Sequence, residues 1–262
     1  MIVSQPLLDV RDVTLQYKTS ERLVTATNRV SFQIRTGDRF VLLGPSGCGK
    51  STLLKAVGGY IAPVAGEIRL AGVPIRKPGP DRVMVFQEFD QLLPWKTVKE
   101  NVKFALTASR TLGDKEAEER ALHYIAKVGL AKFADSHPHT LSGGMKQRVA
   151  IARGMAMEPQ ILLMDEPFAA LDALTRQQMQ DELLRLWDDT HFTVLFVTHS
   201  IPEAVKLGNR ILLLSAHPGR VRDLIESDGS DRVDDSGQLL SERIHRQLFD
   251  NPTEREEAFH VA

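Results

Sequence analysis

Short apolar runs separated by turn residues make up the first part of the chain and predict strands. Residues 8–15 alternate loosely between apolar and polar side chains, and two similar runs follow at 24–27 and 30–34. A turn at 36–38 then leads into the mostly apolar residues 39–43. Alternation is typical of an antiparallel sheet with one solvated face, whereas a continuous apolar run suits a strand covered on both faces. We therefore expect a small antiparallel sheet followed by a buried strand.

The middle of the chain changes to helical spacing. From residue 88 to about 158, apolar positions recur every three to four residues between loops, and the clearest case runs from Asp114 to Gly129. Its apolar face is formed by Ala117, Ala121, Ile125 and Val128. Asp114 is suited to cap this helix, and Gly129 is suited to end it. The pattern indicates a helical region inserted between strands.

Strands of the buried kind return after the helical region. Residues 160–164 and 193–197 are continuous apolar runs, and each ends in polar residues. A helix is expected between them at 175–189, and the last clear strand is expected at 211–214. The alternation of strands and helices predicts an α/β fold with a mainly parallel sheet.

The C-terminal part of the chain is polar. Residues 226–241 contain repeated serine, aspartate and glycine and are expected to form a loop or linker. Residues 242–259 are expected to form a short charged helix.

Composition and charge exclude several classes of protein. The 262 residues are 42% hydrophobic and 26% charged, which is ordinary for a globular protein with a sizeable core. The formal net charge of -1 gives no bias towards nucleic acid or an anionic membrane. The chain has no signal-peptide pattern and no apolar run of about 18 residues, so membrane association is expected only through a partner. The one cysteine, Cys48, fits a reducing, cytosolic setting.

A glycine-rich segment, Gly44–Thr52 (GPSGCGKST), connects the buried strand at 39–43 to an apolar helix start. In this setting the pattern G-x-x-x-x-G-K-[ST] indicates a phosphate-binding loop, in which backbone N–H groups and the helix dipole converge on an anion. Lys50 is expected to contact the β- and γ-phosphates, and the Ser51 hydroxyl to bind Mg²⁺. The nucleotide-binding residues of this loop are Gly44, Pro45, Ser46, Gly47, Cys48, Gly49, Lys50, Ser51 and Thr52. An ordinary glycine turn before a helix is the plainer alternative.

Further polar residues lie where other strands are expected to end, which is where open parallel sheets bind ligands. Asp165 is expected to hold Mg²⁺, and Glu166 to orient or deprotonate an attacking water. His199 is a candidate γ-phosphate contact, and Gln87 a candidate contact to Mg²⁺ or water that also begins a switch segment. Tyr17 either stacks on a purine or packs within its sheet. Each of the others also has a plain structural alternative as a turn or strand-end residue.

The segment Leu141–Arg148 (LSGGMKQR) precedes a predicted helix at Met145–Met155. Ser142, Gly143 and Gly144 would present N–H groups and the helix dipole outward and form a second anion cradle. One nucleotide does not need two cradles so far apart in the chain. A head-to-tail dimer of two copies would need both cradles, because each copy could close its second cradle on the γ-phosphate bound by the other. We therefore expect a homodimer.

Together these motifs resemble the ATP-binding subunit of an ATP-binding cassette (ABC) transporter, across residues 7–225 and in the family's order. The segments that carry the resemblance are GPSGCGKST, Gln87, LSGGMKQR, ILLMDEP, Ala170-Leu171-Asp172 and His199. The resemblance implies a P-loop NTPase core with an N-terminal antiparallel β subdomain and a helical subdomain inserted at approximately 88–158. Residues 226–262 would follow as a C-terminal polar linker and short helix. Ala169-Ala170 departs from the family's usual Ser or Gly before Ala, which leaves the contacts of that loop open.

The resemblance also implies ATP and Mg²⁺ as ligands and a role for each site residue. The catalytic residues it implies are Glu166, His199 and Lys50. The residues it implies for Mg²⁺ are Ser51, Gln87 and Asp165. Tyr17 would stack on adenine, Gly44–Thr52 and Gln87 would bind the nucleotide in the same chain, and Asp172 would lie at the dimer interface. The residues implied to reach ATP across the dimer are Ser142, Gly143 and Gly144.

A finer resemblance is to the importer branch for nitrate, taurine, alkanesulfonates and related small anions. The segments that carry it are Phe86-Gln87-Glu88, Leu92-Leu93-Pro94-Trp95, Asp172–Arg176 and Leu214–Val221. It implies a peripheral subunit on the cytoplasmic side of the inner membrane that works with permease subunits and a periplasmic or extracellular solute-binding protein. Residues 88–95 would dock the permease, and Trp95 either anchors that contact or packs within its own domain.

Other kinds of protein share part of this pattern. The resemblance leaves open an ABC ATPase for a different substrate or a non-transport ABC ATPase acting on DNA or the ribosome, although the coiled-coil insertions or paired cassettes usual in the latter are missing. A module that binds ATP without turnover is disfavoured by Glu166 and His199. A P-loop kinase would leave the LSGG segment unexplained.

Overall fold

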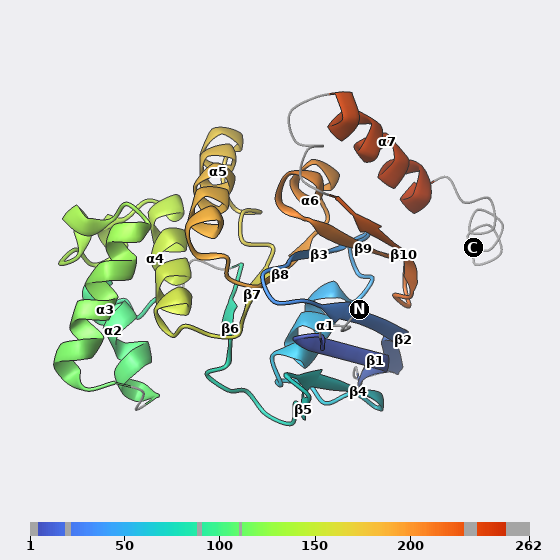
Figure 1. Cartoon of the computed structure of the whole chain (residues 1–262), viewed down its shortest axis with the longest axis horizontal. Helices are drawn as coiled ribbons and strands as arrows, with labels where there is room; N and C mark the ends of the chain where they lie inside the picture. Colours follow the sequence, from blue (N-terminus) through green and yellow to red (C-terminus); the bar gives the residue numbers. More distant parts are fainter. Residues whose placement is uncertain (1–4, 19–21, 88–90, 110–111, 228–234, 250–262) are drawn as a thin grey trace. The chain divides into compact units, whose positions relative to one another are not determined.

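The computed structural model describes residues 5–18, 22–87, 91–109, 112–227 and 235–249 (Figure 1). Residues 235–238 are described by their backbone alone. The chain divides into two compact units. Unit 1 comprises residues 1–76 and 195–262, and unit 2 comprises residues 77–194. Among the described residues, no helix is both long and apolar enough to cross a bilayer.

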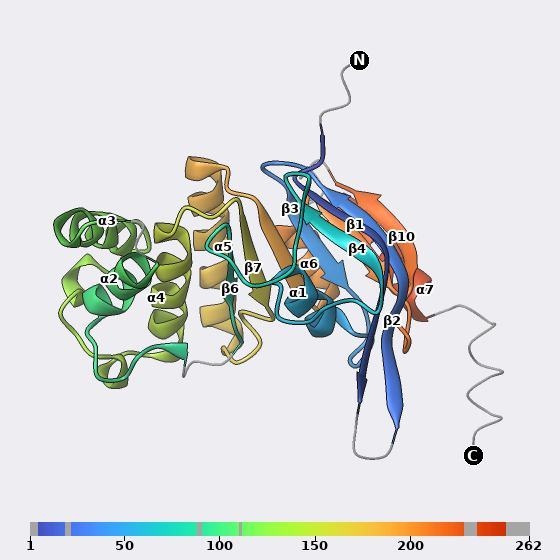
Figure 2. The same cartoon turned by 90° about the horizontal axis from the view of Figure 1, so that it is seen from below.

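Unit 1 contains an antiparallel sheet with the strand order β2-β1-β4-β5. Its strands are β1 (Leu8–Lys18), β2 (Leu23–Ile34), β4 (Ala65–Leu70) and β5 (Val73–Pro74). Figure 2 shows β1 and β2 side by side as one long ribbon pair. The two short strands expected at 24–27 and 30–34 are one strand, because the irregularity between them is absorbed where Arg29 adopts a positive φ of 51° and the register with β1 shifts.

The second sheet of unit 1 has the strand order β10-β9-β3-β8. Its strands are β3 (Arg39–Leu43), β8 (Val194–Thr198), β9 (Arg210–Leu214) and β10 (Val221–Glu226). The residues of β3, β8 and β9 are all buried, and β3 pairs with β9 in parallel. The strand expected at 211–214 is observed as β9, and β10 follows it as a half-buried antiparallel edge strand that the sequence did not reveal.

The helices in the described part of unit 1 are α1 (Lys50–Val57), α6 (Ile201–Leu207) and α7 (Asp235–Phe249). Helix α7 buries Ile244 and Leu248, and its C-terminal carbonyl groups accept hydrogen bonds from the Arg222 guanidinium, at 2.7 Å from Gln247 O. The expected linker at 226–241 and helix at 242–259 were wrong in their boundary, because the helix already begins at Asp235. Residues 250–262 lie outside the described part of the chain.

Unit 2 contains two parallel strands, β6 (Arg82–Val85) and β7 (Ile161–Asp165). The helices between them are α2 (Val98–Ala108), α3 (Asp114–Lys127), the 3₁₀ turns η2 (Ala131–Phe133) and η3 (Pro138–Thr140), and α4 (Gly143–Ala156). Helix α5 (Ala173–Thr190) follows β7.

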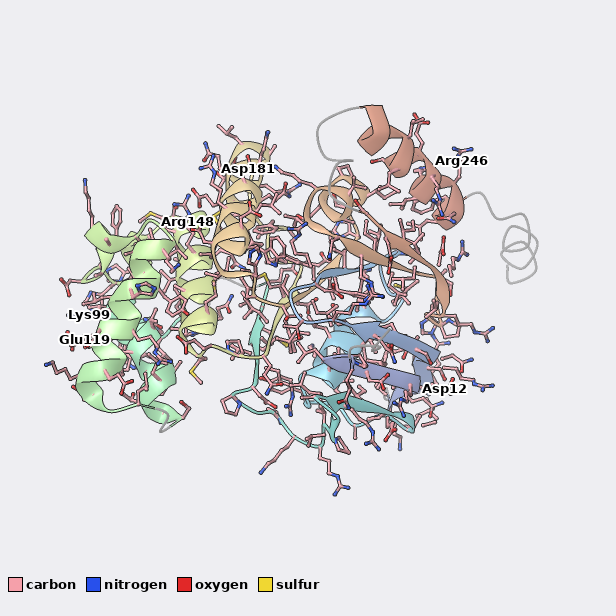
Figure 3. All side chains as sticks on the ribbon, in the orientation of Figure 1. Asp12, Lys99, Glu119, Arg148, Asp181 and Arg246 are labelled. Carbon is pink, nitrogen blue, oxygen red and sulfur yellow. The ribbon has the colours of Figure 1, made fainter. Side chains whose placement is uncertain are left out.

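Helices α2 and α3 pack together and carry a charged outer surface, where Lys99 and Glu119 are labelled in Figure 3. Asp114 does not cap α3 as expected. Gly113 occupies the N-cap, and the Asp114 carboxylate instead lies 2.9 Å from the ammonium of Lys103 on α2. The same ammonium lies 2.9 Å from Glu118, so the charged residues of α3 join the two helices.

Candidate functional site

The phosphate loop lies between the buried strand β3 and the N-terminus of α1 in unit 1. Gly47 and Gly49 adopt positive φ angles of 80° and 91°, which a side chain would strain, and Gly49 is the left-handed N-cap of α1. A Cβ on Gly47 would meet no atom within 4 Å, so the space beside this glycine is open. The first N–H groups of α1 lack helical partners and suit an anion.

The Lys50 side chain is held against the carbonyl groups of this loop. It is 5% exposed, and its ammonium donates to the carbonyl oxygens of Gly44 at 2.8 Å and Pro45 at 2.9 Å. Its Nζ also lies 3.8 Å from Sγ of Cys48, a fully buried residue. Burial raises the pKa of the Cys48 thiol, and the neighbouring Lys50 charge opposes this only in part. The loop thus combines a buried, protonated thiol at Cys48 with an ammonium group at Lys50 that two carbonyl groups hold in place.

Two other predicted site residues belong to unit 1. Tyr17 is 47% exposed near the end of β1, opposite Val24 of β2, so part of its ring is open to solvent. His199 is exposed and directly follows β8, a neighbour of β3 in the sheet. Ser200 next to it caps α6 by accepting from Glu203 N at 3.4 Å, which fixes the backbone beside the histidine.

Asp165 and Glu166 mark the carboxyl end of β7 in unit 2. Asp165 is the last residue of the strand and is buried. Glu166 adopts a positive φ of 42°, a left-handed conformation that is strained in a residue with a side chain. Its carbonyl accepts from Ala169 N at 3.1 Å and closes a turn. Strain of this kind is concentrated at functional sites, where the surrounding structure holds it as part of the mechanism.

Gln87 lies on the same edge of unit 2. Strands β6 and β7 are parallel, with Val85 opposite Met164, so their carboxyl ends coincide. Gln87 is exposed and lies two residues beyond the end of β6, whereas we expected it at the strand end. The first residues of the expected switch segment, 88–90, lie outside the described part of the chain.

The LSGG segment begins α4, which starts at Gly143 and so two residues before the expected Met145. Ser142 is the N-cap, and its hydroxyl accepts from Met145 N at 3.3 Å. A Cβ on Gly144 would lie only 2.9 Å from Cγ2 of Thr175, so a residue larger than glycine would collide with α5. Ser142 is exposed, and the helix N-terminus behind it suits an anion.

Asp172 connects this segment to α5. Its carboxylate caps α5 by accepting from Thr175 N at 3.0 Å, and this backbone hydrogen bond lowers the pKa of Asp172. Thr175 thereby lies against Gly144, a contact that the sequence did not reveal, because the two residues belong to separate predicted helices.

The predicted site residues thus form two groups, one in each unit. Unit 1 holds the phosphate loop, Tyr17 and His199. Unit 2 holds Gln87, Asp165, Glu166 and Ser142–Gly144. No three His, Cys, Asp or Glu side chains gather into a metal-binding cluster anywhere in the described ranges. The donors predicted for Mg²⁺ are instead a hydroxyl, an amide and a carboxylate, and these oxygen ligands fit a cation that usually binds one or two carboxylates together with water and phosphate.

Comparison with known proteins agrees with this geometry. The profile of the ABC transporter family matches residues 27–169. The chain is 48% identical to the taurine import ATP-binding protein TauB of Rhizobium johnstonii, over 87% of this chain and 86% of that protein. It is 40% identical to the bicarbonate transport ATP-binding protein CmpD of a Synechocystis species, over 92% and 86% of the two chains. It is 42% identical to the aliphatic sulfonates import ATP-binding protein SsuB of Bacillus cereus, over 92% and 95%.

Solved structures give the same result. The dimeric post-hydrolysis structure of the ATP-binding cassette MJ0796, bound to ADP and Pi, superimposes with a TM-score of 0.72 and is 33% identical. The match covers 84% of this chain and 98% of that one. The predicted α/β P-loop core with an antiparallel β subdomain and inserted helices is confirmed. The chain therefore belongs to the ABC transporter family, as one of its ATP-hydrolysing subunits.

Proposed function

We propose that this ATPase powers the import of a small anionic solute such as taurine, an alkanesulfonate, nitrate or bicarbonate. The observation that carries the proposal is that almost the whole chain is similar to import or transport subunits named for three different solutes of this kind. The three solutes have only their small size and anionic group in common, so the similarity supports the class of solute. Choice within the class would belong to the other subunits of the importer.

Two copies of the chain would associate head to tail around two ATP molecules. The phosphate loop of one copy would bind the phosphates through its N–H groups and Lys50, and the exposed N-terminus of α4 at Ser142 in the other copy would cover the γ-phosphate. The similarity to a dimeric cassette supports this arrangement. Tyr17, with nearly half of its surface exposed, would stack on the adenine.

Hydrolysis would depend on residues of both units. Glu166 would accept a proton from the attacking water, and His199 would contact the γ-phosphate. Ser51, Gln87 and Asp165 would hold Mg²⁺, which would neutralise charge on the phosphates when bound. The positive φ of Glu166 at the carboxyl end of β7 supports its role, because strained backbone of this kind is concentrated at functional sites.

The permease would dock on unit 2 near Trp95, on the cytoplasmic side of the membrane. The Trp95 side chain is 70% exposed, so it does not pack within its own domain. The loop that presents it is fixed by the fully buried Asn101, whose side chain accepts from Leu93 N at 2.8 Å and donates to the carbonyl oxygens of Leu93 and Lys96. An exposed tryptophan on a rigid loop is typical of an interface anchor.

Replacing Trp95 by Ala is expected to weaken permease binding by about 2 kcal/mol or more, which is the scale of an interface anchor. The ATPase activity and the melting temperature of the isolated subunit are expected to stay unchanged, because the side chain is largely solvated. Binding would be measured with the permease in detergent or nanodiscs. Tyr60→Ala, which removes another exposed aromatic side chain from unit 1, is the matched control. Equal binding by the Trp95 variant and the wild type would contradict the docking assignment.

Uptake into proteoliposomes tests the proposed function as a whole. The chain would be combined with candidate permease and solute-binding subunits from the same organism, and uptake of labelled taurine, ethanesulfonate, nitrate and bicarbonate would be measured with ATP. We expect ATP-dependent uptake of at least one of these anions. Phosphate release without uptake of any of them would favour a different substrate or a role outside transport.

A further inference from the structure

Residues remote in sequence pack closely against the phosphate loop of unit 1. A Cβ on Gly44 would lie 2.9 Å from the carbonyl oxygen of Leu214, the last residue of β9. A Cβ on Gly49 would lie 2.6 Å from the carbonyl oxygen of Ala26 in β2 and 2.8 Å from Cγ2 of Thr27. Both ends of the loop are therefore in backbone contact with neighbouring strands.

The closest of these approaches is made by Gly219, which follows β9 in the turn before β10. A Cβ on Gly219 would lie only 2.1 Å from the carbonyl oxygen of Cys48, far inside van der Waals contact. The turn cannot simply retreat, because Gly219 N donates to Ala26 O and Gly219 O accepts from Asn28 N, both at 2.9 Å. Gly219 thus connects β2 to the phosphate loop at the Cys48 carbonyl.

Ser215 stabilises the turn that carries Gly219. Its hydroxyl accepts from Arg220 N at 3.0 Å and donates to Pro218 O at 3.2 Å, and its N–H donates to Arg220 O at 2.9 Å. These hydrogen bonds close residues 215–220 into one rigid loop.

We propose that Gly219 is a positioning residue for ATP binding, which sets the position of the Cys48 peptide and with it the phosphate cradle. Its backbone φ is not in the left-handed region, so its special requirement is the space at its α-carbon rather than its conformation. Any larger residue would displace the Cys48 carbonyl by roughly 1 Å, and with it the peptide that forms part of the cradle. Lys50 would move with it, because its ammonium is bonded to carbonyl groups of the same loop.

Replacing Gly219 by Ala tests this proposal, which rests on the assignment of Gly44–Thr52 as the ATP cradle. We expect kcat/KM for ATP to fall by about tenfold to a hundredfold, the scale expected for a catalytic group misplaced by about 1 Å. The fall should come from a higher KM, matched by weaker equilibrium binding of ATP. Gly113→Ala is the matched control, because a Cβ at that position meets no atom within 4 Å and the residue lies far from the cradle in sequence.

The single cysteine provides a second measurement that does not depend on ATP. Cys48 is fully buried, so a maleimide should label the wild type slowly. In the Gly219 variant the displaced loop should lose this protection, whereas the Gly113 variant should keep it. Ser215→Ala loosens the turn without adding an atom beside the phosphate loop. It should raise the rate of Cys48 labelling and the KM for ATP to a smaller extent than the Gly219 variant does. It replaces the Gly219 variant in the test if that variant does not fold.

The possible outcomes distinguish a failure of the positioning role of Gly219 from a failure of the assignment of Gly44–Thr52 as the ATP cradle. Folded Gly219 and Ser215 variants with wild-type labelling and wild-type ATP affinity would overturn the positioning role. Weaker ATP binding together with faster labelling would support it. If Lys50→Ala bound ATP as tightly as the wild type, the cradle assignment itself would fail, whatever the labelling showed.

Discussion

Replacing Glu166 by Gln is expected to lower steady-state ATP hydrolysis by about 10²–10⁴-fold, the usual contribution of a general base. The amide keeps the shape of the side chain and its backbone conformation but cannot accept a proton from water. Because binding depends on the phosphate loop and the LSGG segment, ATP should still bind and should hold two copies together. Phosphate release and size-exclusion chromatography with ATP would measure the two effects.

Glu158→Gln is the matched control for this substitution. Glu158 also has a positive φ, 48°, but it precedes β7 instead of following it, and its carboxylate lies 2.9 Å from the Arg120 guanidinium. The control should hydrolyse ATP like the wild type. Full activity of the Glu166 variant would rule out Glu166 as the catalytic base.

Mixing two inactive variants should restore activity if the sites are shared between subunits. Lys50→Ala and Ser142→Ala homodimers should each lose about 10²–10³-fold in kcat, because each lacks a group that stabilises charge on the γ-phosphate. In a random mixture half of the dimers contain one of each chain. One of their two sites then has both defects and the other has none, so about a quarter of the wild-type activity should return.

A second mixture supplies the control for this complementation. Lys50→Ala and Ser51→Ala both damage the phosphate loop, so every site in their mixed dimer carries one damaged loop and no activity should return. Recovery in this control would show that the gain in activity does not depend on which segment each variant has damaged. A lack of recovery in the mixture of the Lys50 and Ser142 variants would contradict a shared site.

The sequence was most informative where one short segment determines its own conformation. The strand at 39–43 was predicted at its observed bounds, and the glycines after it indicated a phosphate loop, because both signals depend only on neighbouring residues. The LSGG segment likewise indicated a helix start, although the helix begins at Gly143, two residues earlier than we expected, with Ser142 as its cap. These segments also carry the family resemblance that the comparisons confirmed.

The errors occurred where tertiary contacts decide the structure. Strand β10 was missed, since its apolar and polar residues do not alternate, and its pairing with β9 is a tertiary contact. Helix α7 includes the serine and glycine at 236–237, which local propensity assigns to a loop, and its later turns bury Ile244 and Leu248. The packing of Gly219 against Cys48 joins positions some 170 residues apart, and no local pattern could have indicated it.

Lys50 also bears on how fast and how selectively the cradle can bind its ligand. A free lysine side chain carries about 2 kcal/mol of rotamer entropy, which it normally loses when it grips a ligand. Because two loop carbonyls already hold the ammonium, most of this loss has occurred before any phosphate arrives. An incoming anion therefore meets a charge that is ready in place and needs only a small reorientation. Arginine would be a poor substitute here, since its planar fork cannot make the same pair of bonds from a single point.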